Sequence, residues 1–439
     1  MKNFLLMFLL VSSSIGVQMK SGGLFTTTLF PLVDEHVHGS TIVECPNGDL
    51  LAAWFQGSGE RWADDVRIMG ARLGSGETVW SEPFLMADTP GFPDINPVLF
   101  LDPQERLWLV WYTVIANQWE TSLLKYRISE NFQHHEAGPQ WAWQDVIHVK
   151  PGDKTERGIQ PGDRFVNAVE RQIKAYRRYL VNEQNAPDAL LRRMDAHAQE
   201  IKRKARGEDW MARGILYKEN GEQQSQPMGY PYFRRMGWQT KNKPFIATSG
   251  RIILPLYSDG FSFSLMAITD DFGATWTFSE PLVGGGNIQA SIAEKTDGTL
   301  VAFMRDNGPP PKRLHTCFST DLGETWSTVK DSDIRNSGAG SDIITLDNGH
   351  WILANNDLEQ GRHSLAIYLS MDEGESWEYI RHLERDDRAE NATRFAYPSI
   401  IRGKDGMIHV IYSVHHQDGR GKTIKYARFD ESWIKYGGD

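Results

Sequence analysis

Short apolar segments alternate with turn residues along most of this chain, and the pattern predicts β-strands. A turn dipeptide followed by an apolar run recurs six times. The runs are DLLAAW at 49–54, RLWLVWY at 106–112, RIILPLY at 251–257, TLVAFM at 299–304, HWILAN at 350–355 and MIHVIY at 407–412. Asn-Gly and Asp-Gly fit tight hairpins because both central residues can adopt positive φ. A second apolar run precedes most copies, so each unit predicts strand, hairpin, strand.

The spacing of these units predicts the fold. From Gly250 onward the turns are 48, 51 and 57 residues apart, and the first interval, from Gly48 to Glu105, is 57 residues. These are the lengths of four-stranded propeller blades. One longer gap of 145 residues, between Glu105 and Gly250, holds the rest of the second blade, the start of the third and an insertion. We expect an all-β, six-bladed β-propeller over residues 20–439.

The insertion, residues 160–208, differs from the rest of the chain in composition. It is rich in Arg, Lys, Glu and Ala. Its apolar residues form two stripes at helical spacing, the second after Pro187, which suits a helix start: Phe165, Val169, Ile173, Tyr176 and Leu180, then Leu190, Leu191, Met194 and Ile201. We expect an α-helical hairpin packed on the propeller. It is either a solvated ornament or a lid at the mouth of the site.

Three segments share the pattern Ser/Thr-x-Asp-x-Gly-x-Thr/Ser-Trp, the Asp box. They are Thr269–Trp276, Ser319–Trp326 and Ser370–Trp377, separated by 50 and 51 residues and in phase with the repeat. The Asp carboxylate can accept hydrogen bonds from turn N–H groups. Gly supplies a backbone conformation that other residues resist, and Trp buries a large ring. The boxes indicate architecture, so function must be argued from the site.

The first 19 residues predict a secretory signal peptide. Lys2 supplies the positive charge, residues 4–11 an apolar core and residues 12–16 small side chains. The apolar run is too short to span a bilayer, and no later segment predicts a membrane span. We therefore expect a secreted or periplasmic protein; an uncleaved buried strand is the alternative.

Net charge and cysteine usage exclude several functional classes. The formal net charge of −10 argues against sequence-independent nucleic-acid binding, which needs a basic surface, although a local basic pocket for an acidic ligand is compatible with it. The two cysteines, Cys45 and Cys317, cannot make a disulfide scaffold. No nucleotide, flavin or metal-ligand motif is present, so we expect no cofactor and no metal ligand set.

On its Asp boxes and six-fold repeat, the chain resembles the sialidase (neuraminidase) superfamily, closest to bacterial neuraminidase-like proteins with BNR repeats. The resemblance covers nearly the whole predicted mature chain except the helical insertion. It implies a glycan or glycoconjugate substrate with a terminal acidic sugar, sialic acid or a related one. It also implies hydrolysis with retention of configuration through a tyrosine nucleophile.

The family binds the substrate carboxylate with three arginines, whose planar forks suit bidentate binding. Arg305, in Phe-Met-Arg-Asp-Asn-Gly, matches the second, and Arg362, in Gly-Arg-His-Ser-Leu, matches the third. The first is missing: the corresponding stretch, 35–40, reads EHVHGS, and His38 lies nearest. The alternative is that Arg305 and Arg362 are surface cations.

Tyr397, in Phe-Ala-Tyr-Pro-Ser-Ile-Ile, matches the nucleophilic tyrosine, a neutral nucleophile that avoids repulsion by an anionic sugar. A packed core tyrosine is the alternative. A count of nine residues back from each of the six turn residues selects Tyr397 and five other positions. We expect all six at one level of the innermost strands, the five others being Gly39, Asn96, Lys241, Gln289 and Gly340. We expect Gln289 and Asn96 to contact substrate near the axis. The glutamate that activates the family's tyrosine is absent, because its region reads Asn287-Ile288-Gln289.

The family's acid/base aspartate lies on a loop after the second strand of the first blade. Here residues 57–66 read GSGERWADDV. We expect Asp65 to be the acid/base, with Asp64 the next candidate and a substrate contact, and Glu60 third. A loop carboxylate can protonate a leaving oxygen when its pKa is raised. A loop-capping role is the alternative.

The two departures from the family leave three functions open. The first is a sialidase-like exo-glycosidase. The second is a lyase or glycosidase on uronate-containing glycans, with His38 or His36 transferring the proton. The third is a glycan-binding propeller without catalysis. A lyase product gains ultraviolet absorbance from its new double bond, whereas a hydrolase product does not.

Overall fold

The computed structural model describes residues 18–20, 23–133, 138–153, 163–206, 213–217, 223–227, 235–388 and 390–437. The expected signal peptide, 1–19, lies outside these residues except for its last two positions. No helix in the described ranges combines the length and apolarity that crossing a membrane requires.

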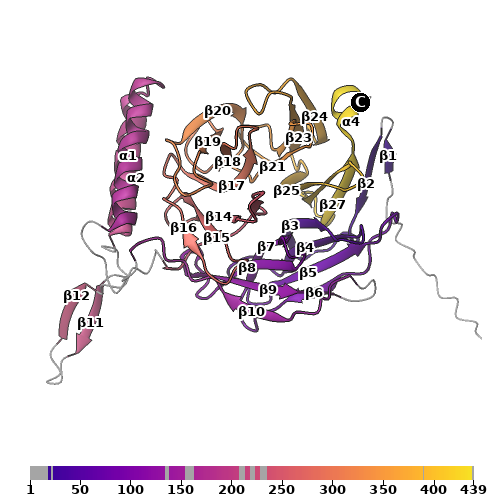
Figure 1. Cartoon of the computed structure of the whole chain (residues 1–439), viewed down its shortest axis with the longest axis horizontal. Coiled ribbons are helices and arrows are strands. Elements are labelled where there is room, and N and C mark those ends of the chain that lie inside the picture. Colours follow the sequence, from indigo (N-terminus) through magenta and orange to yellow (C-terminus); the bar gives the residue numbers. More distant parts are fainter. Residues whose placement is uncertain are drawn as a thin grey trace, which may run out of the picture.

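Six antiparallel sheets are arranged around one axis, so the chain is the six-bladed β-propeller that the repeats predict (Figure 1). The inner strands of most adjacent blades contact one another. The first three blades are β3 (His36–Glu44), β4 (Leu50–Gly57), β5 (Arg67–Leu73) and β6 (Phe84–Ala87); β7 (Asp94–Leu101), β8 (Leu107–Val114), β9 (Ser122–Ser129) and β10 (Trp143–Val146); and β13 (Phe245–Ile246), β14 (Ile252–Ser258), β15 (Phe263–Thr269) and β16 (Thr277–Phe278).

The last blade contains both ends of the described chain. Its strand order, β25-β26-β27-β2-β1, places β2 beside β27, with Phe25 opposite Arg428 and Thr28 opposite Lys425. The last three blades are β17 (Asn287–Glu294), β18 (Leu300–Asp306), β19 (Arg313–Ser319) and β20 (Lys330–Arg335); β21 (Asp342–Thr345), β22 (Trp351–Asn355), β23 (Ser364–Ser370) and β24 (Tyr379–Arg385); and β25 (Arg394–Arg402), β26 (Ile408–His416), β27 (Gly421–Phe429), β2 (Leu24–Thr28) and β1 (Gln18–Lys20). The ring is therefore closed by pairing of the N-terminal strand with the C-terminal ones.

The apolar runs form strands that are buried on both faces because each blade packs between two others. All eight residues of β8 are buried, as are all seven of β14 and of β23. Strands covered on both sides read as continuous apolar runs rather than as alternating ones. Trp54, Trp111 and Trp351 are among the largest fully buried side chains and fill the space between blades.

The three Asp boxes share one hydrogen-bond pattern, in the turns between the third and fourth strands of their blades. In the second box, Thr325 N donates to Asp321 Oδ1 (2.9 Å), and Gly323 N donates to Ser319 Oγ (2.9 Å). Gly323 has φ +86°, which the sequence pattern predicted. Since successive antiparallel strands alternate in direction, these turns lie at the opposite end of the blades from the starts of β3 and β25.

The insertion forms the expected helical hairpin, α1 (Arg164–Asn182) and α2 (Asp188–Ala205), which lies beside the ring in Figure 1. All five residues of the first predicted stripe are buried. Phe165 packs edge-on against Phe261 of the third blade, and Gln172 Nε2 donates to the Trp326 carbonyl of the fourth (3.2 Å). The hairpin is thus docked on two blades and is not a solvated ornament.

The remaining elements are short. They are η1 (Trp119–Thr121), the separate two-stranded sheet of β11 (Arg213–Tyr217) and β12 (Gln223–Pro227), and α4 (Glu431–Tyr436).

Candidate active site

The innermost strands bulge at the level that the nine-residue count selects. Four of the six counted positions have positive φ: Gly39 (+62°), Asn96 (+47°), Gln289 (+58°) and Tyr397 (+55°). Each lies where the register of its strand shifts against the next strand of the blade. A bulge inserts one extra residue and re-aims the side chain. The repeat in the sequence therefore located the bulges, which direct side chains toward the axis.

The six counted positions meet in space. Gln289 Nε2 donates to Tyr397 Oη (3.1 Å). A Cβ on Gly39 would lie 2.4 Å from Asn96 Oδ1, and one on Gly340 would lie 2.9 Å from Gln289 Oε1 and 3.0 Å from Lys241 Cε. Glycine is needed at both positions because the neighbouring polar side chains occupy the space that a larger residue would take.

Tyr397 lies at the centre of this cluster with 9% of its surface exposed. Arg305 Nη1 donates to its Oη (2.9 Å), the same oxygen that accepts from Gln289. The His38 ring stacks on the phenol ring at 4.2 Å, and the Arg362 guanidinium lies 5.3 Å from the ring centroid. Two hydrogen-bond donors therefore meet at one phenol oxygen.

Arg305, at the end of β18, and Arg362, in the loop before β23, are both partly buried. Within the described part of the chain, neither forms an ion pair with a carboxylate. Arg305 Nη2 donates to Asn307 Oδ1 (3.0 Å), and its buried Nε has no partner in the structure. Burial, with Arg305 nearby, lowers the pKa of Arg362. Burial opposes the charge of Arg305, but Tyr397 and Asp259 raise its pKa overall. Two adjacent guanidinium groups that form no ion pair with a described carboxylate can bind an anion.

Three histidines occupy the place of the missing first arginine. The rings of His36, His38 and His415 lie 5.3–5.8 Å apart. His38 Nδ1 hydrogen-bonds Ser413 Oγ (2.8 Å), and His415 Nε2 donates to the Val37 carbonyl (2.6 Å). Burial lowers the pKa of His38 well below its ordinary value and that of His415 to about 4. Both rings are therefore neutral near pH 7.

His36 is the histidine of this cluster with a carboxylate partner. Its Nε2 lies 3.2 Å from Glu60 Oε1, at ion-pair distance but outside hydrogen-bond geometry, and both side chains remain partly exposed. Desolvation raises the pKa of Glu60, but His36 and the nearby Arg362 outweigh it, so the net shift is downward. The pair places an imidazole and a carboxylate near Arg362.

Asp65 and Asp64 form hydrogen bonds with nearby loop residues and none with this cluster in the described part of the chain. Asp65 is exposed and accepts hydrogen bonds from Ser58 N (3.1 Å) and Ser58 Oγ (2.8 Å). Slight desolvation raises its pKa, but the hydrogen bonds from Ser58 lower it overall. Asp64, also exposed, accepts from Asn117 Nδ2 (3.3 Å). Both have the loop-capping geometry, and Glu60 is the carboxylate of this loop that approaches the arginines.

Asn96 and Lys241 support the cluster from below. Asn96, 4% exposed, donates to Tyr112 Oη (3.1 Å) and Tyr257 Oη (3.3 Å). Lys241 Nζ donates to the Pro398 carbonyl (2.5 Å), beside Tyr397, and burial lowers its pKa to about 8. Their burial suits positioning of neighbours more than contact with a ligand.

Sequence reasoning undervalued three residues of this site: Lys241, Glu60 and His36. The count selected Lys241 but assigned it no role, and Glu60 was ranked behind two aspartates because loop residues carry no repeat signal. Among the described residues, no group of three or more His, Cys, Asp or Glu side chains is arranged to hold a metal ion.

Comparisons with known proteins bear on the family and the fold of the chain. The family model described as BNR repeat-like domain matches residues 48–156 and 206–410. An anhydrosialidase of Macrobdella decora is 24% identical over 209 residues, which is 42% of this chain and 26% of that protein. The chain thus spans about a quarter of the length of the curated relative it matches.

Two solved structures have the same fold at low identity. A protein of unknown function from Dyadobacter fermentans superposes with a TM-score of 0.60 at 13% identity, covering 94% of this chain and 98% of that one. The leech intramolecular trans-sialidase, solved with 2,7-anhydro-Neu5Ac, gives 0.59 at 14% identity, covering 95% and 71%.

Proposed function

Because the chain belongs to the sialidase superfamily through its BNR repeat-like domain, we propose that it is a glycosidase that releases a terminal acidic sugar, sialic acid or a related one, from glycans. One observation carries the proposal: two arginines without a carboxylate partner lie against one tyrosine. Arg305 contacts the Tyr397 oxygen, and Arg362 lies over the ring. A sugar carboxylate bound by both arginines would hold its anomeric carbon near that oxygen.

In this mechanism Tyr397 Oη attacks the anomeric carbon, and the bond to the leaving oxygen breaks. The phenol proton passes to water as the new bond forms, while Arg305 and Gln289, which take the place of the family's glutamate, donate hydrogen bonds to the oxygen. The His36–Glu60 pair donates a proton to the leaving oxygen. Water then attacks the anomeric carbon, and the bond to Tyr397 breaks while the His36–Glu60 pair takes a proton from that water. The two displacements together retain the configuration.

The test is a release assay on aryl and oligosaccharide sialosides and on uronate-containing glycans. We expect an acidic monosaccharide as product and, with a fluorinated sialosyl donor, a covalent adduct on Tyr397 detected by peptide mass spectrometry. Tyr397→Phe should lose the adduct and at least about 100-fold in kcat. Arg305→Lys and Arg362→Lys should raise KM about tenfold, since lysine cannot bind a carboxylate bidentately. Full activity of Tyr397→Phe would contradict this mechanism.

The His36–Glu60 pair favours one second candidate, a lyase acting on uronate-containing glycans. There the two arginines would neutralise the carboxylate while a histidine removes the proton beside it. The product would absorb in the ultraviolet, and no tyrosine adduct would form. Binding of several glycans without turnover of any would favour the non-catalytic alternative.

We also propose that the protein acts outside the cytoplasm, on the basis of the apolar N-terminal segment. Mass spectrometry of the protein from an expressing bacterium should find it in the periplasm or medium, cleaved near residue 19. A cytoplasmic protein that retains Met1 would contradict this assignment.

A further inference from the structure

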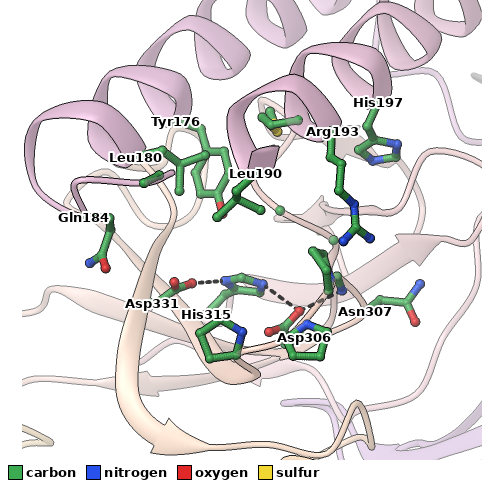
Figure 2. Close-up of a pocket in the computed structure, with 18 of the residues that line it drawn as sticks. Tyr176, Leu180, Gln184, Leu190, Arg193, His197, Asp306, Asn307, His315 and Asp331 are labelled. Atoms are coloured by element: carbon green, nitrogen blue, oxygen red, sulfur yellow. Dashed lines mark hydrogen bonds and ion pairs between the residues drawn. The ribbon is translucent and has the colours of Figure 1, made fainter. Parts of the chain in front are cut away.

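A cavity of about 540 Å³ lies between the helical hairpin and the fourth blade (Figure 2). Sites for small ligands in proteins have volumes of about 300–1,000 Å³. The hairpin contributes an apolar wall with two basic side chains, and the blade contributes glycines, prolines and a polar floor. The residues that the argument uses are Tyr176, Leu190, Arg193, Asn307, His315 and Asp331.

The polar floor consists of a buried histidine between two carboxylates. His315, 2% exposed, has Nδ1 2.8 Å from Asp331 Oδ1 and Nε2 3.4 Å from Asp306 Oδ1. Neither contact has hydrogen-bond geometry, so both ring nitrogens lack a hydrogen-bond partner. Burial opposes the charged ring, but the two carboxylates raise its pKa to about 9. Burial of three charged groups with incomplete hydrogen bonding costs free energy. A ligand that supplies the missing hydrogen bonds would lower this cost.

Close backbone approach holds the hairpin against this floor. A Cβ on Gly285 would lie 2.4 Å from Tyr176 Oη of α1, and one on Gly308 would lie 2.3 Å from the Gly285 carbonyl oxygen. Tyr179 Oη accepts from Asp331 N (3.1 Å). The cavity walls are therefore fixed by packing of the helices.

The cavity adjoins the candidate active site through Asn307. This residue lines the cavity, and its Oδ1 accepts from Arg305 Nη2 (3.0 Å). Arg305 lies near the end of β18 and Asn307 directly follows the strand, so the candidate active site and the cavity meet at this end of the strand.

The charges of the cavity balance. Arg193 and His315 are cationic, whereas Asp306 and Asp331 are anionic, so the four groups sum to zero. This balance contrasts with Arg305 and Arg362 of the neighbouring site, which form no ion pair with a described carboxylate. The cavity therefore suits an uncharged ligand with hydroxyl groups toward the polar floor and an apolar face toward Tyr176 and Leu190. A sugar ring has both features.

We propose that this cavity binds the neutral sugar that precedes the acidic sugar in the glycan, so that the helical insertion recognises the leaving group. This assignment rests on the proposed function of the neighbouring site. Helix α2 would then select substrates by the glycan to which the acidic sugar is attached.

The test compares Arg193→Ala with its neighbour Arg192→Ala, an exposed arginine of the same helix that does not line the cavity. The measured quantity is the ratio of kcat/KM for 3′-sialyllactose to kcat/KM for an aryl sialoside. We expect Arg193→Ala to lower the ratio about tenfold, equivalent to about 1.4 kcal/mol, and Arg192→Ala to leave it unchanged. Leu190→Trp, which fills the cavity from the hairpin side, should lower it as well.

A binding experiment separates this proposal from the proposed function. Lactose and a panel of neutral disaccharides are titrated into the full chain while the His315 ring protons are followed by NMR. Shifts in the wild type and in Arg192→Ala, weakened in Arg193→Ala, would support the cavity even if no sialoside were cleaved. Sialoside cleavage with equal ratios in both variants, or no His315 shift with any disaccharide, would overturn it.

Discussion

At the scale of single residues, backbone conformation determines which side chains reach the axis. Tyr397, Gln289 and Asn96 all have positive φ, which costs a non-glycine residue about 1–2 kcal/mol. Such strain persists where surrounding structure enforces it, and it concentrates at functional sites. The bulges therefore reduce the stability of the fold, and they place polar side chains at the axis.

The two loop carboxylates provide the first prediction. Glu60→Gln should lower kcat about 100-fold or more on substrates with poor leaving groups, because it removes the partner of His36. Asp65→Asn, the matched control, should change kcat less than about threefold, since Asp65 caps Ser58. Both changes in kcat are measured on a series of aryl sialosides whose leaving groups differ in pKa. The reverse order of effects would restore Asp65 as the acid.

Gln289 provides the second. Gln289→Glu places a carboxylate at hydrogen-bond distance from the Tyr397 oxygen, where the superfamily resemblance implies a glutamate. We expect faster formation of the tyrosine adduct, by about 10-fold, measured by rapid-quench mass spectrometry, because a base then accepts the phenol proton. Gln289→Leu, which removes the donor, should slow it. A slower Gln289→Glu would mean that pairing of the new carboxylate with Arg305 outweighs the gain.

Individual residues of the candidate active site show which features can be predicted from the sequence and which cannot. The resemblance identifies Tyr397, and the fixed distance from the hairpin turns independently supports that position and selects Gln289. Glu60 and His36 were undervalued because the direction of a loop side chain depends on the loop's path, which no repeat constrains. The charge at Arg305 was evident, but the absence of a carboxylate partner required coordinates.

At the scale of elements, the Asp box is a hydrogen-bonded unit that ties a turn to its own blade and to the neighbouring one. Arg251 of the third blade donates from Nη1 to the Leu322 carbonyl in the box of the fourth (3.3 Å). Arg106 of the second blade makes the matching contact with Phe272 in the box of the third (3.0 Å). Each of these boxes therefore also fixes the angle between adjacent blades.

Removing a box carboxylate is the third prediction. Asp321→Ala leaves Thr325 N without an acceptor and removes the bonds from Ser319 and Thr325 hydroxyls. We expect the free energy of unfolding to fall by about 1–3 kcal/mol, with kcat nearly unchanged, because the box lies at the other end of the blade. Urea unfolding measures it. Asp333→Ala, an exposed carboxylate on β20 of the same blade, should change it by less than about 0.5 kcal/mol.

The helical hairpin illustrates how far pattern reasoning reaches at this scale. Its apolar stripe predicted which face of α1 is buried, and the structure confirms it. The stripe did not indicate which blades it packs on, because apolar contact is non-directional. The cavity therefore emerged only from the tertiary arrangement.

At the scale of the whole molecule, stability depends on pH through buried histidines with opposite shifts. Burial lowers the pKa of His409 to about 4, so below pH 6.5 the unfolded chain takes up a proton that the folded chain refuses. The His315 pKa is raised to about 9 by its carboxylates, against the effect of burial, so the folded chain keeps a proton that the unfolded chain loses above pH 6.5.

The fourth prediction follows from these signs. The free energy of unfolding should fall as pH drops from about 6.5 to 4 and also as pH rises from about 6.5 to 9, by up to about 1.4 kcal/mol per pH unit for each group. Urea unfolding at graded pH measures it. His409→Gln should reduce the slope on the acid side, where His38 and His415 supply the rest. His315→Gln should flatten the alkaline side, whereas the partly exposed His363→Gln should alter neither side. Unchanged slopes in both variants would contradict the assignment.

The pairing of β2 with β27 has a consequence for how the molecule is made. About 400 residues separate these partners in the chain, so their contact is among the most non-local in the molecule. A ribosome releases the N-terminal strand first and its partner last. The early strand must therefore wait, unpaired on that edge, while five blades form. We expect protease resistance at the N-terminal strand to appear only after synthesis ends, so nascent chains would be sensitive there until release.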